Sequence, residues 1–215
     1  MSFKEFKDKA KRTLKKVWWF LWEDESIWSW IANIVLAFVL IKFIVFPGLG
    51  LLFGTSYPIV AVVSGSMEHD GNFDQWWTSS ADCSMLGQQT CSQEDWYQTY
   101  GISKETFLEY KLHNGFNKGD IIFLKSAKDA KIGDILVFMT PYRPEPIIHR
   151  VIKIEEKDNK KIYQTKGDHN PYSGKYDMNI TEQQVLGKSM FKVPWLGWIK
   201  IGFVNFLSLF GFQVS

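Results

Sequence analysis

The longest apolar stretch of the sequence runs from Ile27 to Phe53, and polar side chains are rare within it. An α-helix of about 20 apolar residues crosses the hydrocarbon core of a bilayer, so the stretch predicts a transmembrane anchor. Asn33 and Lys42 interrupt it, and Lys42 lies near one end, where its ammonium group can reach the lipid headgroups. Pro47 and Gly48 are expected to end the helix.

Residues 1–26, before the anchor, are basic and amphipathic, and half of the ten tryptophans cluster close to the start of the apolar stretch. Basic flanks remain in the cytoplasm, which predicts a cytoplasmic N-terminus and an extracytoplasmic chain after Pro47. The long apolar run, its long leader and the lack of an A-x-A site directly after it favour an uncleaved anchor over a cleaved signal peptide. The basic residues are Lys4, Lys7, Lys9, Lys11, Arg12, Lys15 and Lys16, and the tryptophans are Trp18, Trp19, Trp22, Trp28 and Trp30.

The C-terminal segment, residues 195–215, is again apolar and aromatic, but Lys200, Asn205 and several glycines interrupt it. A second span, an interfacial helix and a core helix of the domain all fit this pattern. We favour a membrane-associated segment.

Between these ends, residues 54–194 predict one extracytoplasmic domain built of short strands. Runs of alternating or β-branched residues are separated by turns rich in Gly, Asp and Asn. No helical pattern separates the later strands, so we expect a mainly β fold, an antiparallel sheet or barrel-like domain. The expected strands lie within Tyr57–Met67, Asp120–Ser126, Asp134–Thr140, Ile147–Glu156, Lys161–Gly167 and Val185–Phe191.

Residues 68–117 are polar and irregular, and we interpret them as an insertion with two short helices that begin at Ser92 and Ser103. The insertion carries both cysteines, Cys83 and Cys91. Outside the cytoplasm they can form a disulfide, and two free thiols are the alternative; their spacing does not indicate a metal site. The insertion is interpreted as a lid, a partner surface, a membrane-contacting flap or a tolerated surface loop, and we favour the last.

Charge excludes one class of function: a net charge of +2 over 215 residues does not indicate a nucleic-acid-binding protein. Candidate chemistry begins at Ser64-Gly65-Ser66, where glycine permits a tight turn at a strand end. A serine needs an adjacent base to become a nucleophile. Taken alone, the motif is more often a turn of small residues.

His149 is one of four histidines and lies in an apolar strand. Alternation places Ile147 and His149 on one face and Ile148 and Arg150 on the other. A neutral histidine can act as a general base, although an inward-facing histidine is more often structural.

Lys166-Gly167-Asp168-His169-Asn170-Pro171 forms the third candidate motif, and Asp177 follows it. A carboxylate behind an imidazole fixes its tautomer and stabilises the imidazolium. The same string is also typical of a turn.

The order of these motifs along the chain resembles that of the signal peptidase I family. The order is the anchor, Ser64-Gly65-Ser66-Met67, the Gly-Asp-Ile strands, His149-Arg150 and Lys166-Gly167-Asp168. The resemblance is to the archaeal and endoplasmic-reticulum type, in which a histidine replaces the lysine base of most bacterial enzymes. It covers roughly Tyr57–Met67 and Lys118–Trp198.

The resemblance implies that Ser66 is the nucleophile and that Ser64 and the Ser66 backbone N–H form the oxyanion hole. It implies that His149 is the general base, with Asp168 and Asp177 as the catalytic acids, and that no metal or cofactor is needed. The chain departs from the family in the longer spacing between the two acids, in the insertion, and in Glu68-His69 where the family has Glu-Pro. His69 is therefore a rival base.

The resemblance further implies a membrane-bound serine endopeptidase that removes signal peptides from preproteins, with lipid and secretion-machinery contacts. It would act in a cell membrane or an endoplasmic-reticulum-type membrane. A peptidase for another exported precursor and a catalytically inactive, membrane-tethered subunit are the alternatives.

Overall fold

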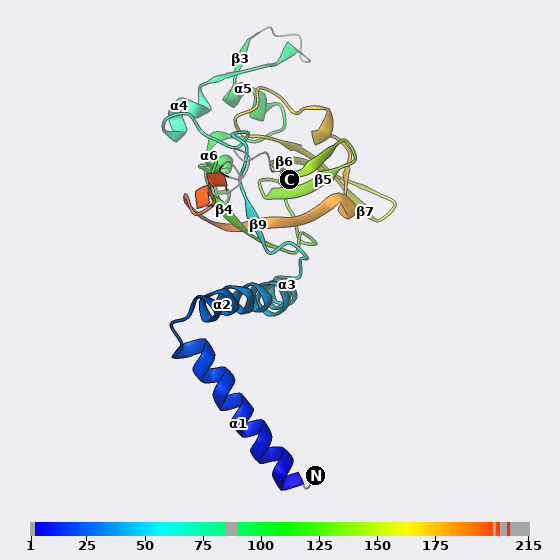
Figure 1. The fold of residues 1–215 in the computed structure, drawn as a ribbon. Helices are drawn as coiled ribbons and strands as arrows, with labels where there is room; N and C mark the ends of the chain where they lie inside the picture. Colours follow the sequence, from blue (N-terminus) through cyan, green and yellow to red (C-terminus); the bar gives the residue numbers. More distant parts are fainter. Residues whose placement is uncertain (1–2, 85–89, 200, 203–205, 207–215) are drawn as a thin grey trace. The chain divides into compact units, whose positions relative to one another are not determined.

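The computed structural model describes residues 3–84, 90–199, 201–202 and 206. It forms two compact units, Met1–Leu52 and Phe53–Ser215. The first is helical, and the second is built around a β-sheet (Figure 1).

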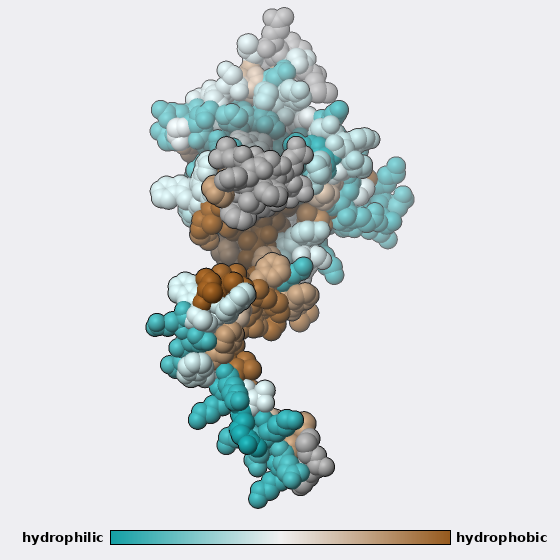
Figure 2. Space-filling view, in the orientation of Figure 1, coloured by the Kyte–Doolittle hydropathy of each residue, from teal (hydrophilic) through white to brown (hydrophobic). Residues whose placement is uncertain are grey.

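The first unit contains an amphipathic helix and a long apolar helix. The elements are α1 (Phe3–Trp22), α2 (Ile27–Leu40), the π-helical turn η1 (Ile41–Val45) and α3 (Phe46–Phe53). The last three join into one helix of 27 residues, Ile27–Phe53, which is long and apolar enough to cross a membrane. Figure 2 shows apolar side chains gathered over this helix, whereas the side of α1 in view is mainly hydrophilic.

The prediction that Pro47 and Gly48 end the apolar helix is wrong. Pro47 is the second residue of α3, which directly follows η1, and the Phe46 N–H bonds to the Ile41 carbonyl. Proline lacks an N–H but is tolerated in the first turn of a helix, and a π-turn changes the hydrogen-bond register ahead of it. The helix therefore continues to Phe53.

The second unit has a seven-stranded sheet in the order β1-β4-β9-β5-β6-β7-β8, and every neighbouring pair is antiparallel. This confirms the predicted mainly β, antiparallel fold. The strands are β1 (Ile59–Ala61), β4 (Ile121–Lys125), β5 (Ile135–Thr140), β6 (Arg143–Lys157), β7 (Lys160–Lys166), β8 (Ile180–Thr181) and β9 (Val185–Val193).

Strand β6 is the centre of the domain, because residues 147–152 are buried on both of its faces. Ile147 packs in one apolar cluster and Ile148 in another, as the alternation predicts. The His149 ring lies edge-on to Phe138, a member of the Ile147 cluster. Arg150, on the other face, lies over the ring of Phe107.

The insertion folds into short helices and a two-stranded hairpin. The helices are capped by Ser92 and Ser103 as predicted, whereas a first helix capped by Asn72 was not expected. Cys83 and Cys91 form a disulfide, so the free-thiol alternative is wrong. The elements are α4 (Phe73–Trp77), β2 (Ser80–Ala81), β3 (Cys91–Ser92), α5 (Gln93–Gln98) and α6 (Lys104–Leu108).

The insertion is part of the hydrophobic core. Trp76, Trp77, Tyr97 and Phe107 are almost fully buried in one cluster with Ile152 of β6. Burying an aromatic side chain of this size stabilises a fold by about 2 kcal/mol or more. The favoured interpretation as a tolerated surface loop therefore does not hold.

Most of the predicted C-terminal segment 195–215 lies outside the described residues. The described part includes Trp198, whose indole ring packs against Gly119.

Candidate active site

Ser66, His149 and Gly167 come from three different segments and meet at one point. A Cβ atom on Gly167 would lie 2.6 Å from the Ser66 carbonyl oxygen and 2.8 Å from His149 Nε2. The His169 N–H donates to the same Ser66 carbonyl, at 3.0 Å. The loop after β1, the middle of β6 and the end of β7 therefore converge around a glycine that leaves room for both the serine backbone and the imidazole.

Ser66 is half-buried in the turn that follows β1. Its Oγ lies 3.3 Å from Ser64 Oγ. The next residue, Met67, is buried, and its sulfur accepts the Asp168 N–H at 3.4 Å. This contact attaches the Ser66 turn to the segment after β7. In the described residues no hydrogen bond joins Ser66 Oγ to His149 Nε2; in ligand-free sites such bonds are often long and tighten only around substrate.

His149 is held by Asp177. The Asp177 carboxylate forms a hydrogen bond with His149 Nδ1, and also accepts the Thr165 hydroxyl at 2.6 Å and the Gly174 N–H at 2.9 Å. Both His149 and Asp177 are buried. A carboxylate that receives Nδ1–H leaves Nε2 as the proton acceptor, and Nε2 is the atom beside Gly167 and Ser66.

The longer spacing between the two acids is accommodated by a loop that folds back on β7. The Ser173 hydroxyl donates to the Thr165 carbonyl at 2.6 Å, and Asp177 ends the short helical turn η3 (Lys175–Asp177). This brings Asp177, rather than Asp168, against the imidazole.

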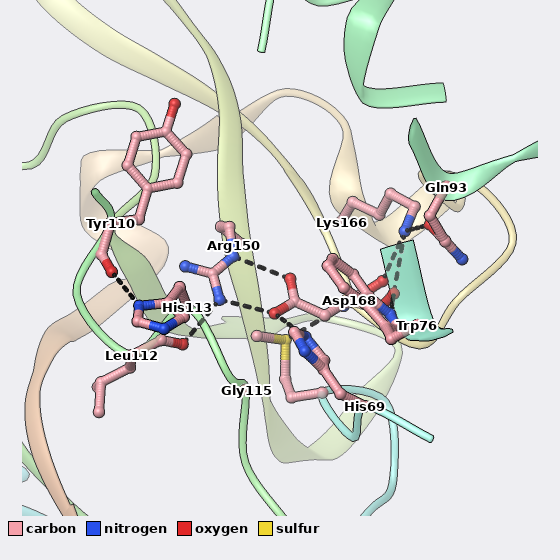
Figure 3. A network of polar contacts seen from close by, with 12 residues as sticks. His69, Trp76, Gln93, Tyr110, Leu112, His113, Gly115, Arg150, Lys166 and Asp168 are labelled. Atoms are coloured by element: carbon pink, nitrogen blue, oxygen red, sulfur yellow. Dashed lines mark hydrogen bonds and ion pairs between the residues drawn. The ribbon is translucent and has the colours of Figure 1, made fainter. Parts of the chain in front are cut away.

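Asp168 lies in a separate buried network (Figure 3). Arg150 Nε and Nη2 donate to its two carboxylate oxygens at 2.9 and 2.6 Å. Tyr97 Oη donates to it at 3.2 Å, and His69 Nε2 lies 3.0 Å away. Burial alone would raise the pKa of Asp168, but the charge of Arg150 and the hydrogen bonds from His69 and Arg150 hold that pKa well below its usual range.

His69, the rival base, is occupied within this network. Its ring stacks on Trp76 with the ring centroids 3.6 Å apart, and its Nε2 faces Asp168. Burial lowers its pKa, and the hydrogen bond to Asp168 only partly opposes this. His69 thus contacts Asp168, while His149 lies beside Gly167 and Ser66.

Lys166 links the insertion to the backbone of the site. Its ammonium group is fully buried and donates to Gln93 Oε1 at 2.7 Å, to the Gly167 carbonyl at 3.1 Å and to the Asp168 carbonyl at 3.3 Å. Burial lowers the pKa of Lys166 to about 7, although the charges of Asp168 and Asp177 oppose the shift. Helix α5 is thereby attached to the backbone of Gly167 and Asp168, and Gly167 lies against His149.

Lys166 should make the stability of the protein depend on pH. The folded state releases its proton near pH 7 and the unfolded state near the ordinary lysine value, so the unfolded state binds more protons between these pH values. The free energy of unfolding should therefore rise with pH from 7 towards 10, by at most about 1.4 kcal/mol per pH unit. Urea denaturation at several pH values measures this slope.

Lys166→Met should remove this slope, whereas Lys160→Met, at the exposed first residue of β7, should retain it. An unchanged slope in Lys166→Met would contradict the assignment.

No family model matches the chain. It is 30% identical to the signal peptidase complex catalytic subunit SEC11 of Komagataella phaffii over 171 residues, 74% of each chain. It is 35% identical over 102 residues to the SEC11C catalytic subunit of Homo sapiens, which covers 44% of this chain and 53% of that protein.

These matches define the class as membrane-anchored proteases. Within it, the chain belongs to the signal peptidase I family of the endoplasmic-reticulum type, the family of the SEC11 catalytic subunits. The chain spans about half the length of the mammalian relatives that it matches.

Gly167 was not predicted from the sequence as a separate part of the site. Its signal was present: a glycine between two charged residues at a strand end is typical of a close backbone approach. Tyr97 and Trp76, which contact Asp168, lie in the insertion and carry no motif. Among the described residues, no group of three or more His, Cys, Asp or Glu side chains could hold a metal ion.

Proposed function

We propose that this protein is a membrane-anchored serine endopeptidase that removes signal peptides, with Ser66, His149 and Asp177 as its catalytic groups. One observation carries the proposal: Asp177 binds His149 Nδ1, and the opposite imidazole nitrogen lies beside Gly167, next to Ser66. Membership in a family of signal peptidase catalytic subunits supports it.

The reaction is acyl transfer. His149 Nε2 takes the proton of Ser66 Oγ as this oxygen attacks the scissile carbonyl, and Asp177 stabilises the imidazolium. The imidazolium then gives its proton to the leaving amine. An ester on Ser66 remains, and a water molecule activated by His149 releases it. No other group is required for proton balance.

The oxyanion of each tetrahedral intermediate would be stabilised by the Ser66 N–H and the Ser64 hydroxyl. The 3.3 Å separation of the two serine hydroxyls supports this role for Ser64, because the oxyanion forms next to Ser66 Oγ. Losing one such donor typically costs about 3 kcal/mol in the transition state.

Asp168 is proposed as a positioning residue. Its backbone N–H reaches the Met67 sulfur and its side chain holds Arg150, which neighbours His149 on β6. It thereby links the serine turn to the histidine strand without touching the reacting atoms.

The substrates would be preproteins, because the relatives are named as catalytic subunits of a signal peptidase complex. The same name supports partner subunits for this chain. With the basic segment 1–26 in the cytoplasm and 27–53 as the anchor, residues 54–194 would form the extracytoplasmic catalytic domain.

Mapping the cut in a preprotein tests the proposal. The full-length protein in lipid nanodiscs is mixed with a model preprotein, and the products are identified by mass spectrometry. Wild type and Ser56→Ala, at an exposed serine, should cut at the signal-peptide junction, and Ser66→Ala should not. A cut at the junction by Ser66→Ala would overturn the proposal.

Gly167→Ala should reduce cleavage by about 100-fold, because the added methyl group pushes Ser66 and His149 apart. Gly48→Ala is the matched control, since a Cβ there meets nothing within 4 Å. The ratio of kcat/KM values measures the effect. Cleavage by Gly167→Ala within a few-fold of wild type would contradict the close approach.

A further inference from the structure

Helix α1 has an apolar face that the fold leaves exposed. None of its residues, all of which the structure describes, is buried. Phe3 is 80% exposed and Leu14 is 70% exposed. At 3.6 residues per turn one face collects Phe3, Phe6, Ala10, Leu14, Val17 and Leu21.

Most of the charged residues of α1 are basic, and most of the lysines flank this face. Glu5 and Asp8 lie on the opposite side of the helix together with Arg12 and Lys15, and the flanking lysines are Lys4, Lys7, Lys9, Lys11 and Lys16. Lysines at the margins of an apolar face can bury their stems while their ammonium groups stay at headgroup level. The helix therefore suits a surface with an apolar interior covered by a layer of negatively charged groups.

The C-terminal end of α1 is fixed to the start of the apolar helix. Ser29 Oγ donates to the Phe20 carbonyl at 2.6 Å, and Asn33 Nδ2 donates to the Leu21 carbonyl at 2.8 Å. These bonds satisfy carbonyl groups that a helix end leaves without partners. They also explain the polar Asn33 within the apolar stretch. Helix α1 therefore ends at the start of the anchor helix.

Exposed tryptophans cluster at the junction of α1 and α2. Trp18 and Trp22 stack with ring centroids 4.7 Å apart, and both are exposed, as are Trp28 and Trp30 at the start of α2. Trp concentrates at membrane–water interfaces.

We propose that α1 lies in the plane of the membrane and binds anionic lipid headgroups with its marginal lysines, while its apolar face enters the boundary of the acyl chains. A helix with an apolar face, many basic residues and low net hydrophobicity behaves in this way. Helix α1 is too charged to span the bilayer. Because its C-terminal end is attached to the start of the anchor helix, α1 lies close to the lipid. Each Lys or Arg near an anionic leaflet adds to the attraction.

Cysteine accessibility in the full-length protein tests the proposal. The sequence has two cysteines, and both are in the disulfide, so an introduced cysteine can be labelled alone. Leu14→Cys places the thiol on the apolar face, and Asp8→Cys, the matched control, places it on the opposite face. Both proteins are reconstituted in POPC nanodiscs with and without about one-third POPG, and reacted with a water-soluble maleimide.

In POPG nanodiscs, Leu14→Cys should react roughly tenfold more slowly than Asp8→Cys. The difference should shrink in pure POPC, and also when Lys7, Lys9, Lys11 and Lys16 are all replaced by Gln. Equal rates for the two cysteines in POPG nanodiscs would overturn the proposal. Protection of Leu14→Cys that is unaffected by both POPG and the four Gln replacements would also overturn it, because the apolar face would then be covered without any contribution from anionic headgroups. Neither measurement depends on peptidase activity.

Discussion

Asp177→Asn is expected to slow preprotein cleavage by about 10⁴-fold while the protein remains folded. Asp177 accepts hydrogen bonds from His149, Thr165 and Gly174, and an asparagine can keep the contact to Thr165. It cannot stabilise the imidazolium, and its amide favours the tautomer in which Nε2 carries the proton. The turnover number kcat should carry the loss, because Asp177 does not touch the substrate.

Asp158→Asn is the matched control for this prediction. Asp158 is an exposed residue in the turn between β6 and β7, and its positive φ suits asparagine. Its cleavage rate should equal that of wild type. If Asp177→Asn kept the wild-type rate, Asp177 would not be the group that orients the base.

Asp168→Leu is expected to destabilise the domain by about 3–5 kcal/mol, because it leaves the fully buried Arg150 without its counter-charge. The low folded-state pKa of Asp168 means that this stabilisation is fully present above the unfolded-state pKa and is lost as pH falls through the folded-state pKa. The loss therefore appears at neutral pH. Urea denaturation of the detergent-solubilised protein measures it.

The double variant Arg150→Met/Asp168→Leu separates the charge pair from simple packing. Replacing both partners by apolar side chains removes the unpaired buried charge, so the double variant should recover much of the lost stability. A double variant less stable than Asp168→Leu would show that the ion pair is not the source of the effect.

The strands and the order of the site motifs could be predicted from sequence because both are local. Alternation placed His149 with Ile147, and a serine before a polar run marked α5 and α6. The choice between Asp168 and Asp177 could not be made from the sequence. It depends on a loop that returns to β7 through a Ser173–Thr165 hydrogen bond.

The contacts of the insertion also could not be predicted from the sequence. Its polar, irregular sequence indicates a surface loop, yet Trp76 and Tyr97 reach Asp168, and Gln93 reaches Lys166. Such contacts join residues far apart in the chain, and no periodicity reports them. The prediction that the helix ends at Pro47 was wrong for a local reason. The π-turn before Pro47 changes the hydrogen-bond register, so the usual effect of proline on a helix does not apply there.

A double-mutant comparison of cleavage rates tests the central claim most directly. The value of kcat is measured on one preprotein in nanodiscs for wild type, Ser66→Ala, His149→Ala and the double variant. Residues that act as one unit are strongly non-additive, so each single variant should lose about 10⁶-fold and the double variant should lose no more. A His149→Ala protein that cleaves at the wild-type rate, or losses that multiply in the double variant, would contradict a Ser66–His149 catalytic pair.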